Sequence, residues 1–451
     1  MNDTICAIST SLAKSAISII RVSGDEAILI VNKLFDGKDL TKVKTHTIHY
    51  GYIKDNDEII DEVLVSVMLA PKTFTCENVV EINCHGGIAA TNKILELLLT
   101  NGCRLANNGE FTKRAFLNGR IDLMKAEAVM DMINADNDKM RKVSINQLRG
   151  VGSNMIRKLR EDLINIISNI EVNIDYPEYE DIYEVTKKDV QGKIDDINQK
   201  MLEIVNEYEN GRIIKNGINT LILGRPNVGK SSLLNKLLQY EKAIVTDIPG
   251  TTRDIVEGEV LIDGIKLNII DTAGVRKTDD LVEQLGVKKS LEKINEADLV
   301  LLLLNNHEEI NDIDMMLLDK TKDINSIIVI NKDDLSSNID LEKIKNREYV
   351  YINTLSDDGI SNLKEKIKHM FALDKLDNSD YCFITNTRQI AKIKECCSII
   401  DEIKTSLKDD VSLDMIELDL RRIWDLLGEI VGDSYSEELL DELFSKFCVG
   451  K

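Results

Sequence analysis

The chain has 451 residues, 43% hydrophobic and 30% charged, a balance typical of a globular protein that excludes an intrinsically disordered one. This length exceeds what one hydrophobic core holds, so two or three domains are expected. The net charge of −21 disfavours a stand-alone binder of RNA or membrane surfaces, because such binding depends on Lys and Arg. An RNA substrate therefore requires a local basic patch or a more basic partner.

Targeting signals are not apparent in the sequence. The longest apolar run, residues 299–304, is far shorter than the roughly 20 residues that span a bilayer. The first ten residues lack the basic and apolar regions of a secretion signal. The eight cysteines include no C-x-x-C pair, which is typical of free thiols in a reducing compartment. We therefore expect a cytoplasmic protein without membrane association.

The N-terminal part predicts an α+β domain, because short β-branched runs alternate with glycine. The predicted strands are 16–22, 59–69 and 78–82, and the predicted helix is 88–99. From residue 122 onward, apolar residues recur at helical spacing. Pro177 divides this region into two long helices, and residues 386–447 are helical again.

An α/β segment lies between the two helical blocks. Its short apolar runs are mostly separated by helical stretches, the pattern of a parallel sheet. The runs are 220–223, 267–270, 299–304, 327–330 and 349–352. This order predicts an α/β domain inserted into a helical domain whose two segments join into one bundle.

A phosphate-binding loop follows the first of these strands. Residues 224–231 (GRPNVGKS) fit the pattern G-x-x-x-x-G-K-[ST] and precede an apolar helix, as the motif requires. The glycines let backbone N–H groups close around phosphates at a helix N-terminus. Lys230 is expected to reach the β- and γ-phosphates, and Ser231 to ligate Mg²⁺.

Further motifs specify a guanine nucleotide. Residues 271–274 (DTAG) follow the second parallel strand, where Asp271 can act on the magnesium shell and Gly274 can sense the γ-phosphate. Residues 331–334 (NKDD) read as N-K-x-D, and the Asp334 carboxylate can accept both N1–H and N2–H of guanine. Adenine offers neither donor, so it leaves a polar group unpaired. Thr251 or Thr252 supplies the switch threonine for Mg²⁺.

These motifs predict a Ras-like P-loop G domain with Mg²⁺ on Ser231 and Thr252. At the fifth motif the usual Ser-Ala-Lys is replaced by Asn353, Thr354 and Leu355, where binding is expected through backbone N–H groups. The predicted GTP-binding residues are Asn227, Val228, Gly229, Lys230, Ser231, Ser232, Thr246, Asp247, Ile248, Pro249, Gly250, Thr251, Thr252, Asp271, Thr272, Ala273, Gly274, Asn331, Lys332, Asp333, Asp334, Asn353, Thr354 and Leu355.

Two groups that usually support GTP hydrolysis are missing. Val275 stands directly after the D-x-x-G glycine, where small GTPases often place the glutamine that orients water. No clear internal arginine finger is present, although Arg253 and Arg276 lie nearby. Hydrolysis therefore needs another water-orienting group and another positive charge.

The whole chain, including stretches outside the nucleotide-binding motifs, resembles the MnmE (TrmE) family of tRNA-modification GTPases. The matching stretches are 20–24 (IRVSG), 74–81 (FTCENVVE), 85–87 (HGG), 109–120 (GEFTKRAFLNGR), 246–254 (TDIPGTTRD) and 448–451 (CVGK). The resemblance implies an N-terminal tetrahydrofolate-binding and dimerisation domain (1–118), a two-segment helical domain (119–212 and 376–451) and an inserted G domain (213–375).

The resemblance also implies how GTP is hydrolysed. Family members form homodimers and hydrolyse GTP when their G domains dimerise, with stimulation by K⁺. The family pattern places K⁺ against Asn227, Thr246, Ile248 and Thr251, where a cation could supply the charge of an arginine finger. It places the water-orienting glutamate on Glu283.

The implied pathway adds an aminomethyl or carboxymethylaminomethyl group to C5 of the wobble uridine in tRNA. The implied partner is the FAD-dependent protein MnmG (GidA), in a heterotetramer or larger assembly. The carbon donor is 5,10-methylene- or 5-formyl-tetrahydrofolate, with ammonium or glycine as second substrate. The matching folate contacts are Arg21, Glu81, Arg120 and Lys451, and Arg120 replaces the family's usual lysine.

Cys448, the fourth residue from the end of the chain, has three possible roles: nucleophile, positioning group or a residue without a function in the site. Its position fits a C-a-a-X lipidation signal only superficially, because Gly450 and Lys451 are not the residues that signal prefers.

Two other functions are alternatives for the whole chain. A ribosome-assembly GTPase usually carries a basic RNA-binding domain, and a dynamin-like scaffold GTPase needs a basic amphipathic surface or a lipid anchor; neither feature is evident.

Overall fold

The computed structural model describes residues 3–175, 187–240, 256–262, 264–270, 293–354, 356, 359–371, 373 and 384–450. The chain divides into two compact units. One comprises Met1–Asn134, Ser144–Met201 and Ala391–Lys451, and the other Ala135–Val143 and Leu202–Ile390. Within the described residues, no helix has a stretch both apolar and long enough to cross a bilayer.

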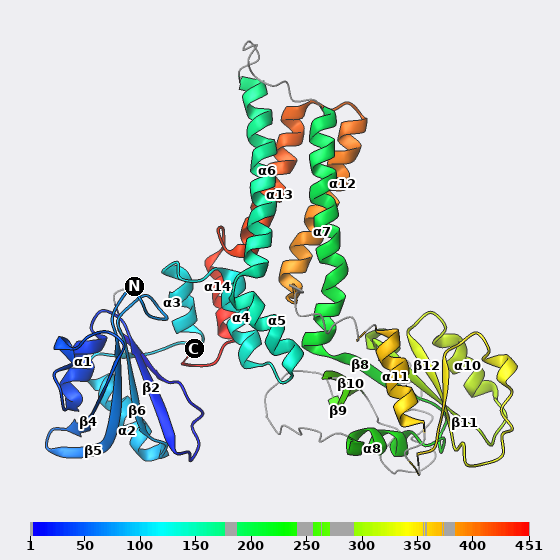
Figure 1. The fold of residues 1–451 in the computed structure, drawn as a ribbon, viewed down its shortest axis with the longest axis horizontal. Helices are drawn as coiled ribbons and strands as arrows, with labels where there is room; N and C mark the ends of the chain where they lie inside the picture. Colours follow the sequence, from blue (N-terminus) through cyan, green and yellow to red (C-terminus); the bar gives the residue numbers. More distant parts are fainter. Residues whose placement is uncertain are drawn as a thin grey trace. The chain divides into compact units, whose positions relative to one another are not determined.

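The N-terminal part of the first unit is a seven-stranded sheet in the order β3-β4-β5-β6-β2-β1-β7, with helices on one face (Figure 1). Neighbouring strands pair antiparallel, except that β1 and β7 are parallel. The elements are β1 (Ile5–Ile8), β2 (Ile17–Ser23), α1 (Ala27–Leu34), β3 (Phe35–Asp36), β4 (Thr47–Asp55), β5 (Glu58–Met68), β6 (Val79–His85), α2 (Ile88–Thr100) and β7 (Arg104–Leu105).

Alternation along β2 and β6 explains why one face of this sheet is open. Ile20 and Val22 on β2 and Ile82 on β6 are buried in a core shared with α1 and α2. Successive side chains of a strand point to opposite faces, so Arg21 and Glu81 lie on the other face, where they are half-buried. The fold thus presents a charged pair on the face that the helices leave uncovered.

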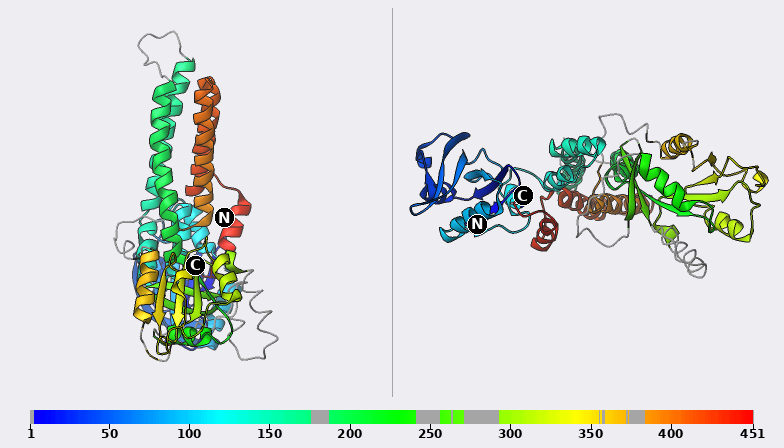
Figure 2. Two further views of the ribbon diagram at one scale, coloured as in Figure 1. Left: turned by 90° about the vertical axis from the view of Figure 1, so that its right-hand side faces the viewer. Right: turned by 90° about the horizontal axis from the view of Figure 1, so that it is seen from below.

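Within the described residues, the helical part contains four bundle helices of 19 to 30 residues and four shorter helices. Ile156, Leu163 and Ile170 recur along the buried side of α6, which packs against α13; the bundle helices lie side by side in Figure 2. The helices are α3 (Glu110–Leu117), α4 (Leu123–Ile133), α5 (Asp138–Leu148), α6 (Val151–Asp175), α7 (Lys187–Asn216), α12 (Thr387–Lys408), α13 (Leu413–Val431) and α14 (Glu437–Ser445). Parts of α5, α7 and α12 belong to the second unit. The break predicted before Pro177 corresponds to the end of α6.

The second unit contains a six-stranded sheet in the order β13-β12-β11-β8-β10-β9. All pairs are parallel except β9 with β10; this antiparallel edge strand is absent from the sequence prediction. The elements are β8 (Ile218–Leu223), α8 (Lys230–Tyr240), β9 (Val256–Ile262), β10 (Ile265–Ile270), β11 (Leu299–Asn305), α10 (Asp312–Lys320), β12 (Ser326–Asn331), β13 (Tyr349–Ile352) and α11 (Ile360–Met370).

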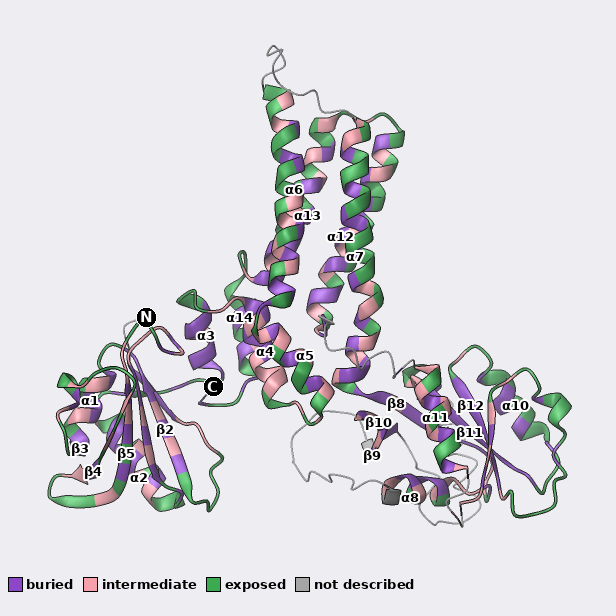
Figure 3. Cartoon of the chain, viewed as in Figure 1, coloured by how far each residue is buried: buried purple, intermediate pink, exposed green. Residues whose placement is uncertain are grey.

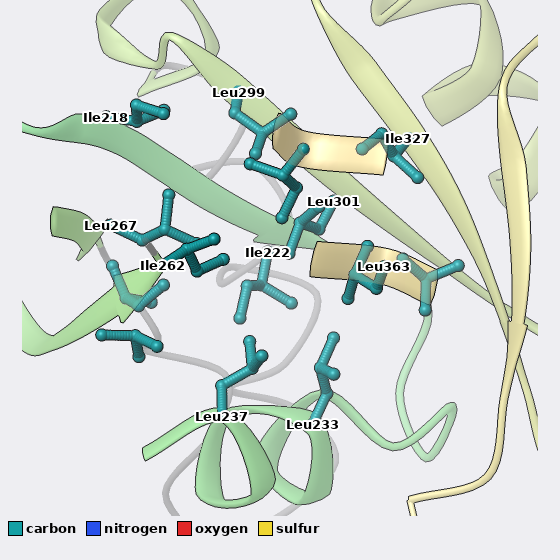
Figure 4. Packing of buried hydrophobic residues seen from close by; sticks show 14 of the residues in the cluster. Ile218, Ile222, Leu233, Leu237, Ile262, Leu267, Leu299, Leu301, Ile327 and Leu363 are labelled. Carbon is teal, nitrogen blue, oxygen red and sulfur yellow. The ribbon is translucent and has the colours of Figure 1, made fainter. Parts of the chain in front are cut away.

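The central strand β11 is buried along its whole length, as the purple ribbon in Figure 3 shows. Leu299 and Leu301 pack in one core with α8 and α11 (Figure 4), whereas Leu302 packs in a second core with α10. Burial of each leucine side chain stabilises the fold by about 1.5–3 kcal/mol. The uninterrupted LVLLLL run is therefore explained by a sheet that is covered on both faces. The predicted fold class, a P-loop α/β domain with α+β and helical parts, is confirmed.

Phe444 on α14 anchors the C-terminal helix to the first unit. Its side chain is 2% exposed and packs with Phe116, Leu123 and Phe447. We predict that Phe444→Ala lowers the free energy of unfolding by about 3–5 kcal/mol, since an aromatic core side chain is lost. Denaturant unfolding followed by fluorescence of Trp424, the single tryptophan, measures this. Leu418→Ala, at a side chain 61% exposed, is the control and should change stability by at most about 0.5 kcal/mol; equal losses would contradict the packing role.

Candidate functional site

The loop between β8 and α8 has the backbone of a phosphate cradle. Gly224 (φ 152°), Asn227 (φ 62°) and Gly229 (φ 102°) all have positive φ, which glycine adopts most readily. A Cβ on Gly224 would lie 2.7 Å from the Leu303 carbonyl oxygen. The loop can therefore hold this shape beside β11 only with glycine there. The loop directly precedes the N-terminus of α8, an arrangement in which backbone N–H groups bind phosphate.

Lys230 closes the loop. Its Nζ donates hydrogen bonds to the carbonyl oxygens of Gly224 at 2.9 Å and of Arg225 at 2.8 Å. This places the ammonium group across the mouth of the loop, where it can contact terminal phosphate oxygens. Ser231 follows directly at the start of α8 and is half-buried. The residues present therefore fit a nucleoside triphosphate with Mg²⁺ on Ser231.

Asn331 joins three loops at the carboxyl edge of the sheet. It is 1% exposed, and its Nδ2 donates to the Val228 carbonyl at 2.8 Å. Its Oδ1 accepts from the Thr354 backbone N–H at 3.4 Å. The loops after β8, β12 and β13 are thus held together by one side chain.

The other residues of the N-K-x-D motif are less buried than Asn331, and Lys332 is half-buried. Lys332 has φ 65°, a left-handed conformation that turns the chain sharply after β12. Asp333 and Asp334 are exposed. The Asp334 carboxylate is therefore accessible to a base bound beside the loops that Asn331 holds.

Arg225, in the phosphate loop, makes a contact that the sequence motifs do not indicate. Its guanidinium pairs with Glu308 at 3.0 Å and with Asp314 at 3.1 Å. Asp314 is 1% exposed and forms a capping box with Asn311 at the start of α10. Burial raises the pKa of Asp314, while the Asn311 N–H and the Arg225 charge oppose the rise. The Asn-x-x-Asp spacing in the sequence indicates the capping box, but not the pairing of Asp314 with Arg225.

Several predicted site residues lie outside the described residues. These are Thr246, Asp247, Ile248, Pro249, Gly250, Thr251, Thr252, Asp271, Thr272, Ala273, Gly274, Glu283, Leu355 and Lys451. Of the predicted K⁺ contacts, the structure describes only Asn227, which is exposed. Across the described ranges, no group of three or more His, Cys, Asp or Glu side chains could hold a metal.

A second site lies on the open face of the N-terminal sheet. Arg21 pairs with Glu81 on the neighbouring strand, with both Nε and Nη2 2.9 Å from Oε1. Arg21 Nη1 also donates to the carbonyl of Gly450 at 3.2 Å, and Ser9 Oγ donates to the same carbonyl at 3.2 Å. The C-terminal segment is therefore held beside the charged pair, and Gly450 has a positive φ of 91°.

A small apolar cluster joins Arg120 to this pair. Phe111 and Phe74 belong to one cluster with Ile5, Ala7 and Ala106. The Arg21 guanidinium lies 5.6 Å from the Phe111 ring centroid, and the Arg120 guanidinium 5.4 Å from that of Phe74. Cation–π contacts of this kind position a guanidinium over a ring. The structure thus brings Arg21, Glu81 and Arg120 around one cluster, although the two phenylalanines were not predicted as site residues.

Cys448 lies in the same C-terminal segment. Its side chain is exposed, and its carbonyl accepts from the Gly109 N–H at 3.3 Å. A Cβ on Gly450 would lie 2.6 Å from the Ile8 carbonyl oxygen, so the tail runs close against β1. The thiol is accessible, and its backbone is fixed beside the cluster.

A parallel sheet with a phosphate loop after its first strand and N-K-x-D after a later strand defines a P-loop GTPase. Two family models match the chain: "MnmE helical domain" over residues 123–448 and "GTP-binding protein TrmE N-terminus" over residues 4–120. The chain belongs to the MnmE family.

Curated relatives match along the full length. The protein named tRNA modification GTPase MnmE of Bacillus velezensis is 47% identical over 458 residues, covering 100% of both chains. The protein of the same name from Enterococcus faecalis is 48% identical to this chain, covering 100% of this chain and 98% of the relative. The Bacillus subtilis protein is 46% identical, covering 100% of both.

Gly229 provides a test of the phosphate loop. A Cβ there would lie 2.2 Å from Asn331 Nδ2, and the positive φ adds strain of about 1–3 kcal/mol. We predict that Gly229→Ala weakens GTP binding at least about tenfold, measured by titration with a fluorescent GTP analogue. Gly264→Ala is the matched control, because Gly264 has φ 72° and a Cβ there would meet no atom within 4 Å. Unchanged affinity in Gly229→Ala would contradict the site.

Proposed function

We propose that this GTPase acts in the modification of tRNA, adding an aminomethyl or carboxymethylaminomethyl group to C5 of the wobble uridine. The observation that carries the proposal is the joining of two sites in one chain: a GTP loop and a C-terminal tail held against a charged pair. The names of the curated relatives support the tRNA substrate. The MnmG-type FAD-dependent protein is the proposed partner, and the cytoplasm is the proposed location.

The proposed domain boundaries follow the sequence motifs. They are 1–118 for the folate-binding domain, 119–212 and 376–451 for the helical domain, and 213–375 for the G domain. The match of the N-terminal family model to residues 4–120 supports the first boundary. The location of strands β8 to β13 between Ile218 and Ile352 supports the third.

The proposed folate site uses Arg21, Glu81, Arg120 and Lys451. Two guanidinium groups suit the carboxylates of a folate, because a guanidinium forms paired hydrogen bonds with a carboxylate. Glu81 offers an acceptor to the N–H groups of the pterin ring. A bound one-carbon tetrahydrofolate would supply the carbon that is transferred, with the Cys448 thiol exposed in the adjoining tail.

A homodimer is supported by the open face of the N-terminal sheet. Ile17 is 59% exposed, Tyr50 57% and Leu64 48%, and Tyr50 and Leu64 are partners across β4 and β5. Large exposed apolar side chains on one face are typical of an interaction surface. A second copy of the chain is the proposed occupant of this face.

The proposed hydrolysis mechanism divides three tasks among residues of the G domain. Lys230 and the loop N–H groups hold the phosphates, Ser231 and Thr252 hold Mg²⁺, and Glu283 orients the attacking water. K⁺ bound by Asn227 and residues 246–251 would supply the positive charge that an arginine finger supplies elsewhere. This division follows from Val275, which cannot polarise water.

Asp334 is predicted to select the base. We expect Asp334→Asn to weaken GTP binding strongly and to favour xanthosine triphosphate, whose C2 carbonyl requires a donor in place of an acceptor. Competition titrations with both nucleotides measure the switch. Asp319→Asn, at an exposed aspartate on α10, is the control and should leave the preference unchanged. Equal hydrolysis of ATP and GTP by the unaltered protein would refute the base pocket.

The C-terminal tail is predicted to contribute to folate binding. Removing residues 449–451 eliminates the Gly450 carbonyl that Arg21 and Ser9 hold. The truncated chain should bind 5-formyl-tetrahydrofolate at least about tenfold more weakly, by calorimetry, because one hydrogen bond to a charged group contributes about 1.5–3 kcal/mol. Its GTP affinity should not change. Unaltered folate affinity would show that the tail is not part of the pocket.

GTP hydrolysis is predicted to depend on K⁺ and on Glu283. The GTPase rate should be at least about tenfold higher in K⁺ than in Na⁺ at equal ionic strength, because an arginine finger contributes about 10³–10⁵ in rate. Glu283→Ala should abolish turnover while GTP affinity stays nearly unchanged, since the lost interaction forms mainly in the transition state. Glu309→Ala removes an exposed acid of the same unit and should remain active. Equal rates in both salts, or an active Glu283→Ala protein, would refute the mechanism.

A further inference from the structure

Arg114 on α3 is a buried cation surrounded by carboxylates. Its side chain is 2% exposed. Nη1 donates to the Asp3 carbonyl at 2.9 Å and to Glu77 Oε1 at 3.0 Å, and Nη2 donates to Asp3 Oδ1 at 2.8 Å and Glu110 Oε1 at 3.1 Å. A buried guanidinium is tolerated only when it is paired in this way. Arg114 is therefore paired with three carboxylates.

Arg104 is a second cation in this cluster and pairs with two of the three carboxylates. It donates to Asp3 Oδ2 at 2.6 Å and to both oxygens of Glu110. The hydrogen bond from Arg104 is the main cause that lowers the pKa of Asp3, assisted by Arg114. Burial opposes ionisation of Glu110, but Arg104, the Asn107 N–H and Arg114 together lower its pKa. Asp3 and Glu110 are thus ionised at neutral pH.

Glu77 connects Arg114 to the loop formed by residues 73–77. Its Oε2 accepts from Ser23 Oγ at 2.7 Å, and its carbonyl accepts from Thr73 Oγ1 at 2.7 Å. Ser23 in turn lies 2.7 Å from Thr75 Oγ1, and both side chains are buried. The Glu77 carbonyl therefore closes the loop on itself, and Arg114 holds the carboxylate of the same residue.

The same loop carries one half of the proposed folate site. The Thr73 carbonyl accepts a hydrogen bond from Arg120, and the Phe74 ring lies beneath the Arg120 guanidinium. Asn118 donates to the Thr75 carbonyl at 2.6 Å. A shift of residues 73–77 would therefore displace both the ring and the carbonyl that orient Arg120.

We propose that Arg114 is a positioning residue of the folate site: through Glu77 it fixes residues 73–77, and this loop orients Arg120 toward the ligand. The inference rests on the proposed folate-binding function. Arg114 itself does not contact the ligand in this arrangement, because it is enclosed by Asp3, Glu77 and Glu110. Ser23 lies two residues after Arg21 on β2, so the same contacts also link the loop to the strand that carries Arg21.

The test compares folate affinity with overall stability. Arg114→Lys keeps the charge, but a single ammonium cannot span Asp3 and Glu77 as the guanidinium does. Glu77→Leu removes the link from the other side. Both variants should bind 5-formyl-tetrahydrofolate at least about tenfold more weakly by calorimetry, well below their melting temperatures. Glu77→Gln, which keeps an oxygen for Arg114, should recover part of the affinity. K⁺-stimulated GTP hydrolysis should stay within about twofold of the unaltered protein.

Arg160→Lys is the matched control for destabilisation. Arg160 is also largely buried, pairs with Asp433 and lies 4.0 Å from the ring centroid of Trp424. Its loss should lower the melting temperature without changing folate affinity. If Arg160→Lys weakens folate binding as much as Arg114→Lys does, a general loss of stability explains the effect and the positioning role is overturned.

Arg21→Gln separates this inference from the function on which it rests. If Arg21→Gln weakens folate binding while Arg114→Lys and Glu77→Leu do not, the positioning role is wrong and the folate site stands. If Arg21→Gln also leaves the affinity unchanged, the folate site itself is refuted, and the role of Arg114 falls with it. Should Arg114→Lys fail to fold, the Glu77→Leu and Glu77→Gln pair decides the question.

Discussion

The six-stranded sheet is buried on both faces, and this constraint decides where the second unit can carry out chemistry. Polar groups cannot be left unpaired between the two hydrophobic cores, so the central strands β11 and β12 are almost entirely apolar. The loops at the carboxyl edge are the places where polar side chains and backbone N–H groups can meet a ligand. Asn331 stands at the boundary: it is as buried as the strand residues before it, yet both ends of its amide pair with loop backbone.

The N-terminal sheet differs from the six-stranded sheet because only one of its faces is covered by helices. Helices α1 and α2 cover one face, and the other face is left to the charged pair of Arg21 and Glu81. A charged pair on an open face gains little stability from its own attraction. Its positioning comes instead from neighbours: the Phe111 ring beneath Arg21 and the C-terminal carbonyl of Gly450 beside it. Residues from both ends of the chain are thus needed to define one site.

Most of the second unit could be predicted from the sequence because its signals are local. A strand buried on both faces is a continuous apolar run, and a phosphate loop is a short pattern of glycine and lysine directly after such a run. The antiparallel strand β9 was not predicted, because its residues carry no uninterrupted apolar run and its position depends on pairing with β10. In the N-terminal sheet, short strands such as β3 and β7, with two residues each, offer too few residues for periodicity to detect.

The sequence by itself determined the class of protein, the guanine-recognition motif and the order of the α+β, helical and α/β parts, because each depends on residues adjacent in the chain. Only the tertiary structure decided which distant residues share a site. Three contacts join residues that are 37 to 429 positions apart in the chain. Arg225 pairs with Asp314, Arg114 pairs with Glu77 at the end of the loop 73–77, and Arg21 donates a hydrogen bond to the Gly450 carbonyl. Such contacts arise when packing brings elements together, and no local pattern of residue types records them.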